Sequence, residues 1–313
     1  MSKEISFENK VIVVTGSGRG LGRAYAVEFA RRGAKVVIND FGGSRVGEGS
    51  STTPAEEAVA ELLALGAEAV ANYDDISQEA GAANLIKAAI DAFGRIDVIV
   101  NNAGIAGGWP LLESPNELFE RFWRVHLLGS VNVTRAAWPY FIKQGGGRVV
   151  NITSEAAMWG MVGQAVYGSA KGAVNGLTKV LALEGAPHNI AVNAIAPAAY
   201  TRMQAEVITD PVHSEFARKS MTSELVVPAI VFLAHESAKV NGQIFGAYSG
   251  RVGRVITGAV PGYYDANMTV ETLRDNWDVA VGDVEDVLIP AELLEAGPLL
   301  TEAAMKNREN APQ

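Results

Sequence analysis

The sequence predicts an α/β protein with a Rossmann-type, doubly wound parallel sheet covered by helices on both faces, and a C-terminal extension. Two observations predict the sheet. Short runs of β-branched residues alternate with alanine-rich segments of helical spacing over residues 1–250, and this alternation implies right-handed crossovers between parallel strands. The strand runs are apolar almost throughout, which is typical of strands that are covered on both faces.

The predicted elements begin with a strand at 11–15 (V-I-V-V-T) and a helix at 20–32 that follows a glycine-rich turn. Pro54 begins a helical pattern at 54–65. A proline is tolerated in the first turn of a helix because the backbone N–H at that position would make no hydrogen bond within the helix. Beyond that helix the alternation continues without an internal repeat. The other predictions are strands at 35–39, 68–71, 97–100, 148–152, 190–195 and 243–248, and helices at 78–93, 115–131, 134–144 and 166–184.

The alternation of strands and helices weakens after residue 250. Residues 251–313 contain the sequence P-G-Y-Y at 261–264 and an acidic segment at 275–286. Earlier in the chain, a Gly/Ser-rich stretch at 42–53 is typical of a surface loop. We therefore expect one Rossmann domain over 1–250 and an extension or arm over 251–313 that forms no second core.

The composition argues against several classes of function. The chain has 313 residues, 48% hydrophobic and 19% charged, which fits a soluble globular protein. It has no cysteine for a disulfide or thiolate metal site, and its four histidines show no metal-ligand spacing. A net charge of −9 argues against a nucleic-acid partner. No segment has the length and apolarity of a signal peptide or membrane span, so we expect a cytoplasmic protein that binds a small molecule.

The segment from Tyr167 to Lys171 carries the most specific chemistry. A lysine four residues after a tyrosine lies on the same helical face, and its ammonium would lower the tyrosine pKa from the usual value of about 10. Ser154 adds a hydroxyl that can hydrogen-bond the oxygen that gains or loses the proton. The three groups suit the interconversion of an alcohol and a ketone. Taken alone, Tyr167 and Lys171 are better explained as an ordinary helix pair, so the interpretation requires a hydride carrier.

The turn from Thr15 to Gly22 predicts the binding site of that carrier. Its sequence, T-G-S-G-R-G-L-G, links the first strand to the first helix, where glycines and free helix amides can bind a pyrophosphate. It departs from the G-x-G-x-x-G pattern, because Leu21 is the sixth residue counted from Gly16. Asp40 ends the second strand, where a carboxylate binds an adenosine ribose diol and repels a 2′-phosphate. Arg19 favours NADP instead, but the repulsion of a dianionic phosphate by Asp40 outweighs it, and we expect NAD.

In order and spacing, these motifs resemble the short-chain dehydrogenase/reductase family over about residues 8–250. The resemblance implies a nicotinamide-dependent oxidoreductase in which Ser154, Tyr167 and Lys171 are catalytic. It also implies a set of cofactor contacts along the carboxyl edge of the sheet. These contacts are Gly16, Ser17, Arg19, Gly20, Leu21, Gly22, Asp40, Asp75, Ile76, Asn102, Ala103, Gly104, Tyr167, Lys171, Pro197 and Thr201.

Longer stretches resemble one branch of that family. The sequences GRAYA (22–26), VINDFGG (37–43), AFGRID (92–97), RVHL (124–127) and TRAAW (134–138) are similar to the (3R)-hydroxyacyl-CoA dehydrogenase part of peroxisomal multifunctional enzyme type 2 and its bacterial stand-alone relatives. This resemblance implies NAD as the oxidant and a 3-hydroxyacyl thioester or a bulky alcohol such as a steroid as the substrate. It further implies a homodimer or homotetramer, in which the C-terminal extension packs at the dimer and can reach the neighbouring site.

Two positions depart from the pattern of the wider family. His126 stands where the family often has an asparagine that holds a proton-relay water, and the sequence leaves open whether His126 joins a relay or has a structural role. The family's Pro-Gly after the sixth strand is Pro197-Ala198 here, and Thr201 follows as the expected carboxamide or phosphate contact.

Alternatives remain open for the substrate and for the class of protein. Trp109, Met158, Trp159 and Met161 follow the fourth and fifth strands, where they could line an apolar substrate pocket or pack in the core. A small cyclic or terpenoid alcohol is the alternative substrate. From another class of function, the alternative is a non-catalytic module that senses NAD, although such a module has no need of the three catalytic groups.

Overall fold

The structure of the protein, a computed structural model, describes residues 4–200, 215 and 218–309. The chain divides into two compact units, Met1–Arg254 and Val255–Gln313. The first unit contains an eight-stranded sheet, and the second contains short helices without a sheet among its described residues.

The sheet has the strand order β3-β2-β1-β4-β5-β6-β7-β8. All neighbouring strands from β3 to β7 pair in parallel. The chain winds from β1 outward to β3 and then crosses to β4, which creates the switch point where open α/β sheets bind ligands. The predicted doubly wound parallel sheet is therefore confirmed. The strands are β1 Val11–Thr15, β2 Lys35–Asn39, β3 Ala69–Asn72, β4 Val98–Asn101, β5 Gly147–Ile152, β6 Ile190–Ala198, β7 Ile244–Tyr248 and β8 Arg251–Val255.

The eighth strand was not predicted and is joined differently from the others. Only Ser249 and Gly250 separate β7 from β8, and both have positive φ, 47° and 79°. Positive φ at both central residues is the geometry of a type I′ hairpin turn, so β8 returns antiparallel to β7. The sequence R-V-G-R-V of β8 is exposed or half-buried. It therefore lacks the apolar run that identified the other strands, as is usual for an edge strand.

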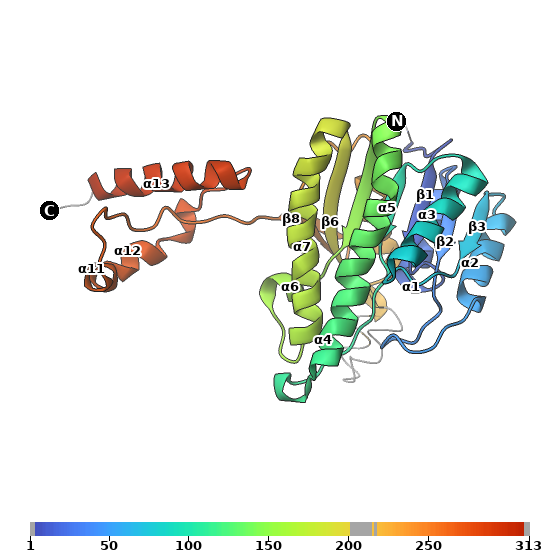
Figure 1. The fold of residues 1–313 in the computed structure, drawn as a ribbon, viewed down its shortest axis with the longest axis horizontal. Coiled ribbons are helices and arrows are strands. Elements are labelled where there is room, and N and C mark those ends of the chain that lie inside the picture. Colours follow the sequence, from blue (N-terminus) through green and yellow to red (C-terminus); the bar gives the residue numbers. More distant parts are fainter. Residues whose placement is uncertain (1–3, 201–214, 216–217, 310–313) are drawn as a thin grey trace. The chain divides into compact units, whose positions relative to one another are not determined.

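Helices cover both faces of the sheet because the strands place alternate side chains on opposite sides. Ile12 and Val14 of β1 join the core beneath the helices that follow β1, β2 and Val226. Val11 and Val13 join the core on the other face, where α3, α5 and α7 lie side by side in Figure 1. The helices of this unit are α1 Gly20–Arg31, α2 Thr53–Ala64, α3 Glu79–Phe93, α4 Asn116–Trp123, α5 Gly129–Gln144, α6 Ala156–Trp159, α7 Ala165–Gly185 and α10 Val227–Leu233.

The predicted break between helices at 131–134 was wrong. Instead α4 runs into a π-helical turn, Arg124–Leu128, which continues directly into α5. The β-branched and asparagine residues at 131–134 have modest helix propensity, but Asn132, Val133 and Thr134 are buried. Tertiary packing therefore overrides local preference. The irregularity lies a few residues earlier, in the turn that carries His126.

The second unit consists of α11 Val270–Asp275, α12 Trp277–Val281 and α13 Leu293–Glu309. A capping box between Thr269 and Thr272 begins α11, and an isolated antiparallel bridge pairs Ala259 with Leu288. Among the described residues of this unit, Ala304 is the one buried hydrophobic side chain. The unit therefore has hardly any core of its own.

Two absences apply to the part of the chain that the structure describes. None of its helices has the length and apolarity needed to cross a membrane. No cluster of three or more histidine, aspartate or glutamate side chains within this part is arranged to hold a metal ion.

Candidate active site

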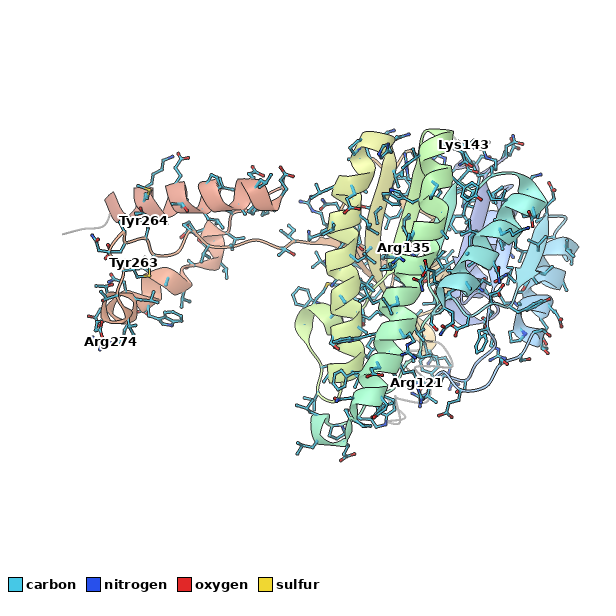
Figure 2. The ribbon with its side chains drawn as sticks, in the orientation of Figure 1. Arg121, Arg135, Lys143, Tyr263, Tyr264 and Arg274 are labelled. Atoms are coloured by element: carbon cyan, nitrogen blue, oxygen red, sulfur yellow. The ribbon has the colours of Figure 1, made fainter. Side chains whose placement is uncertain are left out.

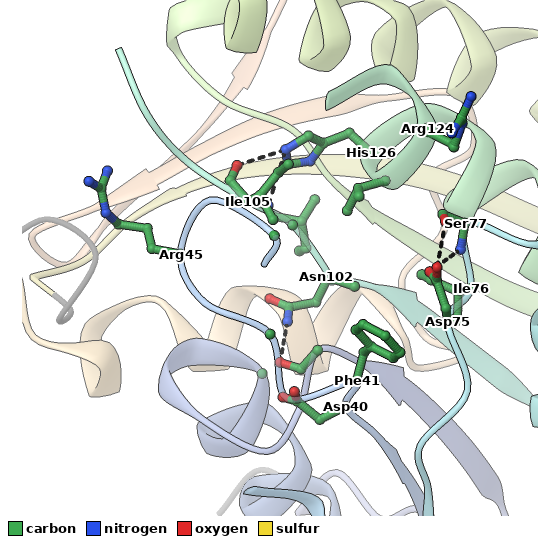
Figure 3. A pocket seen from close by; sticks show the side chains of 18 of the residues that line it. Asp40, Phe41, Arg45, Asp75, Ile76, Ser77, Asn102, Ile105, Arg124 and His126 are labelled. Atoms are coloured by element: carbon green, nitrogen blue, oxygen red, sulfur yellow. Dashed lines mark hydrogen bonds between the residues drawn. The ribbon is translucent and has the colours of Figure 1, made fainter. Parts of the chain in front are cut away.

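A cavity of about 690 Å³ lies at the carboxyl edge of the sheet, around the switch point (Figure 3). Its walls come from the glycine-rich turn, the ends of β2 and β4, the loop after β3, the π-helical turn and α7. The structure thus brings together segments that are far apart in the sequence. The predicted residues that line it are Gly16, Arg19, Gly20, Leu21, Gly22, Asp40, Asp75, Ile76, Asn102, Ala103, Gly104, Tyr167, Lys171 and Pro197.

Close packing explains the glycines of the turn after β1. Gly16 has φ +62°, and a Cβ there would lie 2.7 Å from Ala103 Cα. A Cβ on Gly22 would lie 2.3 Å from the carbonyl oxygen of Gly16. Any side chain at either position would therefore displace backbone. The Asn102 side-chain amide donates to the carbonyls of Thr15 (2.8 Å) and Gly16 (3.0 Å), which fixes the turn against the end of β4.

Ser17 is placed differently from the other residues of the turn. It is fully buried, and its hydroxyl donates to the carbonyl of Val14 at 2.6 Å. Its side chain therefore stabilises the turn by bonding back to the end of β1, and it is not among the side chains that line the cavity.

Asp40 holds the glycine-rich turn and the next loop together. Oδ2 accepts a hydrogen bond from the amide of Gly18, and Oδ1 accepts one from the amide of Gly42, both at 2.8 Å. The carboxylate also faces the cavity, beside the exposed ring of Phe41 (Figure 3). Because each oxygen has further lone pairs, Asp40 retains acceptor capacity toward a ligand.

Asp75 and Ile76 form another part of the cavity wall. The two oxygens of Asp75 accept from the amide and the hydroxyl of Ser77, each at 2.9 Å. The carbonyl of Ile76 accepts from the Asn132 side chain at 3.2 Å. These bonds hold the loop after β3 against α5, with Ile76 facing the cavity.

Ser154, Tyr167 and Lys171 come together from two elements. Ser154 follows β5 and hydrogen-bonds to the Tyr167 side chain. Tyr167 and Lys171 lie one turn apart on α7, with Lys171 Nζ 5.9 Å from the centre of the Tyr167 ring. Lys171 is only 3% exposed, and its Nζ donates to the carbonyl of Ile152 at 2.7 Å. This bond anchors the ammonium, and its other protons remain available.

Burial moves the pKa values of the tyrosine and the lysine in opposite directions. It lowers the pKa of Lys171 to about 7, since a buried ammonium loses hydration. It raises the pKa of Tyr167, and the hydrogen bond from Ser154 opposes part of that rise. The sequence suggested that Lys171 would lower the tyrosine pKa. In the structure burial dominates instead.

His126 lies beside the tyrosine, in the π-helical turn. Its ring is 2% exposed and meets the Tyr167 ring edge-on, with centroids 5.4 Å apart. Nε2 lies 2.8 Å from the carbonyl oxygen of Ile105 and 3.3 Å from its amide nitrogen, so Ile105 holds the ring in either tautomer, and Nδ1 has no protein partner. Burial and the nearby Lys171 charge hold the His126 pKa well below its usual value. A π-turn often marks a functional site, and here it brings a neutral histidine to the cavity wall.

The remaining predicted residues have mixed outcomes. Thr201 lies outside the described residues. Trp109 packs edge-on against Phe122 at 5.9 Å, in a small core cluster next to Tyr167. Trp159 and Met161 are 71% and 63% exposed, so they do not belong to the core. The backbone bond from Trp109 to the carbonyl of Gly163, at 2.9 Å, brings their two loops together.

Several cavity-lining residues were not predicted. Arg121, Arg124 and Ile105 line the cavity from α4, the π-helical turn and the loop after β4. The Gly/Ser-rich loop at 42–53 contributes Gly42, Gly43, Ser44, Arg45 and Gly47. The unusual glycine content of that loop was the only sequence signal, and it could not show which way the loop folds.

Comparisons with known proteins find matches over most of this chain. A family model described as short chain dehydrogenase matches residues 10–211. Peroxisomal multifunctional enzyme type 2 of Mus musculus is 43% identical over 282 residues, covering 89% of this chain and 37% of the mouse enzyme. A short-chain type dehydrogenase/reductase of Mycobacterium tuberculosis is 42% identical over 271 residues, covering 86% of this chain and 93% of that protein. The chain therefore spans little more than a third of the mouse relative and nearly all of the mycobacterial one.

A solved structure supports the same relationship. The 7α-hydroxysteroid dehydrogenase complexed with NADH and 7-oxoglycochenodeoxycholic acid superposes with a TM-score of 0.71 at 29% identity. The superposition covers 78% of this chain and 95% of that chain. The sequence resemblance drawn from the motifs is thus confirmed by independent comparisons of sequence and of structure.

Proposed function

Since this chain belongs to the short-chain dehydrogenase family, and is therefore an oxidoreductase of CH–OH groups that binds a nicotinamide cofactor, we propose that it uses NAD to interconvert a secondary alcohol and a ketone. The observation that carries the proposal is that Tyr167 and Lys171 line the same cavity as Asp40, with Ser154 hydrogen-bonded to Tyr167. In the forward direction, the alcohol loses a hydride to the nicotinamide and a proton to the protein.

The glycine-rich turn fits a dinucleotide. Gly16 and Gly22 leave room where a Cβ would meet backbone, and they bring the start of α1 to the cavity. Backbone amides at a helix N-terminus suit a pyrophosphate. The nicotinamide ring supplies the hydride acceptor when it is bound.

Ser154 and Tyr167 would hold the substrate hydroxyl. Because the two side chains are hydrogen-bonded to each other, both could contact one substrate hydroxyl. That hydroxyl would donate to Tyr167 Oη, and the Ser154 hydroxyl would turn to donate to the substrate oxygen. Tyr167 takes the proton as the C–H bond breaks. Its raised pKa makes the phenolate a strong base once formed. Lys171 lies one turn away with a pKa lowered to about 7, and it would favour the phenolate while it is protonated.

Asp40 supports NAD as the cofactor form. Both carboxylate oxygens are tied to backbone amides at 2.8 Å, so the negative charge stays at the end of β2. A 2′-phosphate would meet that charge, whereas a ribose diol would donate to it. Arg19, which also lines the cavity, is exposed and has freedom to turn into solvent.

Replacement of Asp40 by alanine tests this preference. We expect Asp40→Ala to lower the ratio of kcat/KM for NAD to kcat/KM for NADP by at least about tenfold. A tenfold change corresponds to the loss of about 1.4 kcal/mol of interaction with one charged group. Asp91→Ala, an exposed carboxylate on α3, is the control and should leave the ratio unchanged. An unaltered ratio in Asp40→Ala would contradict the assignment.

For the substrate, we propose a 3-hydroxyacyl-CoA or a hydroxysteroid-type alcohol. The sequence resemblance to the hydroxyacyl-CoA dehydrogenase branch supports the first class, and the name of the hydroxysteroid dehydrogenase supports the second. Both are also supported by Trp159 and Met161, whose exposed side chains follow the strand that leads to Ser154 and offer apolar surface to a long or bulky substrate. A small cyclic or terpenoid alcohol would make little use of that surface.

A substrate screen tests the whole proposal. Purified protein is incubated with NAD and, separately, 3-hydroxyacyl-CoAs, hydroxysteroids and cyclic alcohols, and NADH formation is followed by absorbance. We expect turnover with one of the first two classes. Turnover only of cyclic alcohols would favour the alternative substrate. Tight NADH binding without turnover of any alcohol would favour a non-catalytic NAD-sensing module.

The proposal includes a homodimer or homotetramer in the cytoplasm. Tyr140 and Ile142 of α5, together with Val180 and Leu183 of α7, expose apolar surface on the layer that α3, α5 and α7 form. Burying such a surface against a second copy is a common basis of homo-oligomers. Light scattering of the purified protein tests the oligomeric state. Cell fractionation tests whether the protein is in the cytoplasm or in peroxisomes, the compartment named for the mouse relative.

A further inference from the structure

The loop between β2 and α2 folds into a closed strap. Its two ends meet, because the amide of Ser51 donates to the carbonyl of Phe41 at 3.1 Å. Inside the loop, the amide of Ser44 donates to the carbonyl of Glu48 at 2.8 Å, and the amide of Gly47 donates to the carbonyl of Ser44 at 3.0 Å. Joined ends and internal bonds define an Ω-loop, which can move as one piece. Residues 41–51 are called the strap below.

The tip of the strap touches the opposite wall of the cavity. The Ala106 amide donates to the Arg45 carbonyl at 2.9 Å, and the Arg45 guanidinium donates to the Ala106 carbonyl at 3.1 Å. Arg121 of α4 donates through Nη1 to the Val46 carbonyl at 3.3 Å. A Cβ on Gly47 would lie 3.2 Å from Ile105 Cγ2, so the backbone of the tip packs directly on that side chain. The strap thus bridges the end of β2 to the segment after β4.

These contacts place the strap across the candidate cofactor site. Residues 41–45 and Gly47 line the same cavity as the glycine-rich turn. A dinucleotide with its phosphates on that turn and its ribose at Asp40 must therefore pass beneath the strap. We propose that the strap is a second binding element for the dinucleotide, which closes over it and has to open for each exchange of the oxidised and reduced forms. This inference rests on the nicotinamide-binding function proposed above.

The strap is built to open without disturbing the fold. None of residues 41–50 is buried, so little apolar surface is exposed when the tip lifts. Its contacts with the opposite wall are a few hydrogen bonds, the packing of Gly47 on Ile105, and an exposed ion pair between Arg121 and Glu48 at 3.5 Å. Exposed ion pairs are weak. Gly42 has φ +74° and stands at one end, where it can act as a hinge. Segments of this kind open locally at low free-energy cost.

A cross-link tests the strap directly, because the natural chain has no cysteine. Arg45→Cys combined with Ala106→Cys places two thiols where the strap meets the opposite wall. We expect oxidation to slow NADH dissociation, measured by stopped-flow fluorescence, by at least about tenfold, and reduction to restore the rate of the unoxidised protein. Each single-cysteine variant is a control and should show no change on oxidation.

Removal of the hydrogen bond between Arg121 and the Val46 carbonyl gives a complementary test. Arg121→Ala should raise the rate of NADH dissociation several-fold, and Arg121→Lys, which can still donate to the Val46 carbonyl, should restore it in part. Arg135→Ala is the matched control, because Arg135 of α5 makes a similar exposed ion pair, with Glu79 at 3.6 Å, away from the strap (Figure 2).

Three results would contradict this role of the strap. NADH dissociation that is unchanged in both the oxidised pair and Arg121→Ala would overturn it. So would a folded double-cysteine variant whose thiols do not pair, since the tip would then not rest against Ala106. A wild-type protein that binds neither NADH nor NADPH would instead refute the proposed function, and the strap with it.

Discussion

At the scale of single residues, the chemistry of the site depends on groups whose burial conflicts with their charge. Lys171 is enclosed and has a pKa lowered to about 7. Tyr167 has a raised pKa, and His126 stays neutral because its pKa is held low. A chain that needed only stability would fill such positions with apolar residues. The retention of polar groups there supports a catalytic role.

Tyr167→Phe removes the proposed proton acceptor and preserves the ring contacts with His126 and Phe122. We expect kcat to fall by about two to four orders of magnitude, the usual contribution of a general base. The Kd of NADH should change little. Tyr140→Phe, on the exposed side of α5, is the control and should keep its turnover. Near-normal turnover by Tyr167→Phe would remove this residue from the mechanism.

Lys171 should make the stability of the protein depend on pH. The folded chain releases the lysine proton near pH 7, whereas the unfolded chain keeps it up to about 10.5. Between these values the unfolded state binds more protons, so the free energy of unfolding rises with pH. Urea unfolding at pH 7, 8 and 9 should therefore show wild type gaining stability relative to Lys171→Met.

The control for that measurement is Lys143→Met, since Lys143 is exposed at the end of α5 (Figure 2). Its pH dependence should parallel that of wild type. If Lys171→Met also parallels wild type, the ammonium of Lys171 is not destabilised by burial in the folded protein.

At the scale of elements, the turn after β1 is shaped by backbone contact. Gly22→Ala would place a Cβ 2.3 Å from the carbonyl oxygen of Gly16. We expect a loss of about 1–3 kcal/mol in the free energy of unfolding, which is typical of overpacking, together with weaker NADH binding. Gly176→Ala is the matched control, because a Cβ there, in the exposed part of α7, meets nothing within 4 Å. It should stabilise the protein by about 0.5–1 kcal/mol.

A Gly22→Ala variant as stable as wild type, measured by urea unfolding, would mean that the turn adjusts without cost. In that case the glycine would serve only the approach of the cofactor. Calorimetric titration with NADH separates the two explanations, since a purely structural effect would leave the affinity of the folded fraction intact.

At the scale of the whole molecule, the two units differ in how they gain stability. Met1–Arg254 has extensive cores on both faces of its sheet. Val255–Gln313 buries hardly any of the apolar side chains described in it, and Trp277, Val284 and Leu294 are exposed. A unit of this size without a core cannot meet the entropic cost of folding. We propose that it is an arm that packs at a dimer.

The excised fragment 255–313 should therefore be largely unfolded by circular dichroism. A cooperative thermal transition of the isolated fragment would contradict this expectation. A chain truncated after residue 254 should keep its sheet but lose assembly, as measured by light scattering. If residues 261–264 reach a neighbouring site, hydrogen exchange at that site should rise in the truncated chain; unchanged protection and assembly would refute the arm.

Much of the fold and part of the site could be predicted from local sequence. The parallel strands are continuous apolar runs because both of their faces are buried, so each one is visible in isolation. β8 and the π-helical turn were missed for the opposite reason. An edge strand needs no apolar run, and residues 131–134 are helical only because packing buries them. Likewise Ser17 belongs to the predicted turn, but its side chain points back at Val14.

The sequence by itself determined the sheet, the glycine-rich turn and the residue types available for alcohol chemistry, because each depends on local spacing and on backbone sterics. Only the tertiary structure decided the environment of those residues. The pKa of Tyr167 is raised, the ring of His126 is fixed by Ile105, and the 41–51 strap lies across the cavity. Each of these depends on desolvation or contact between segments far apart in the chain, and such effects leave no trace in local spacing.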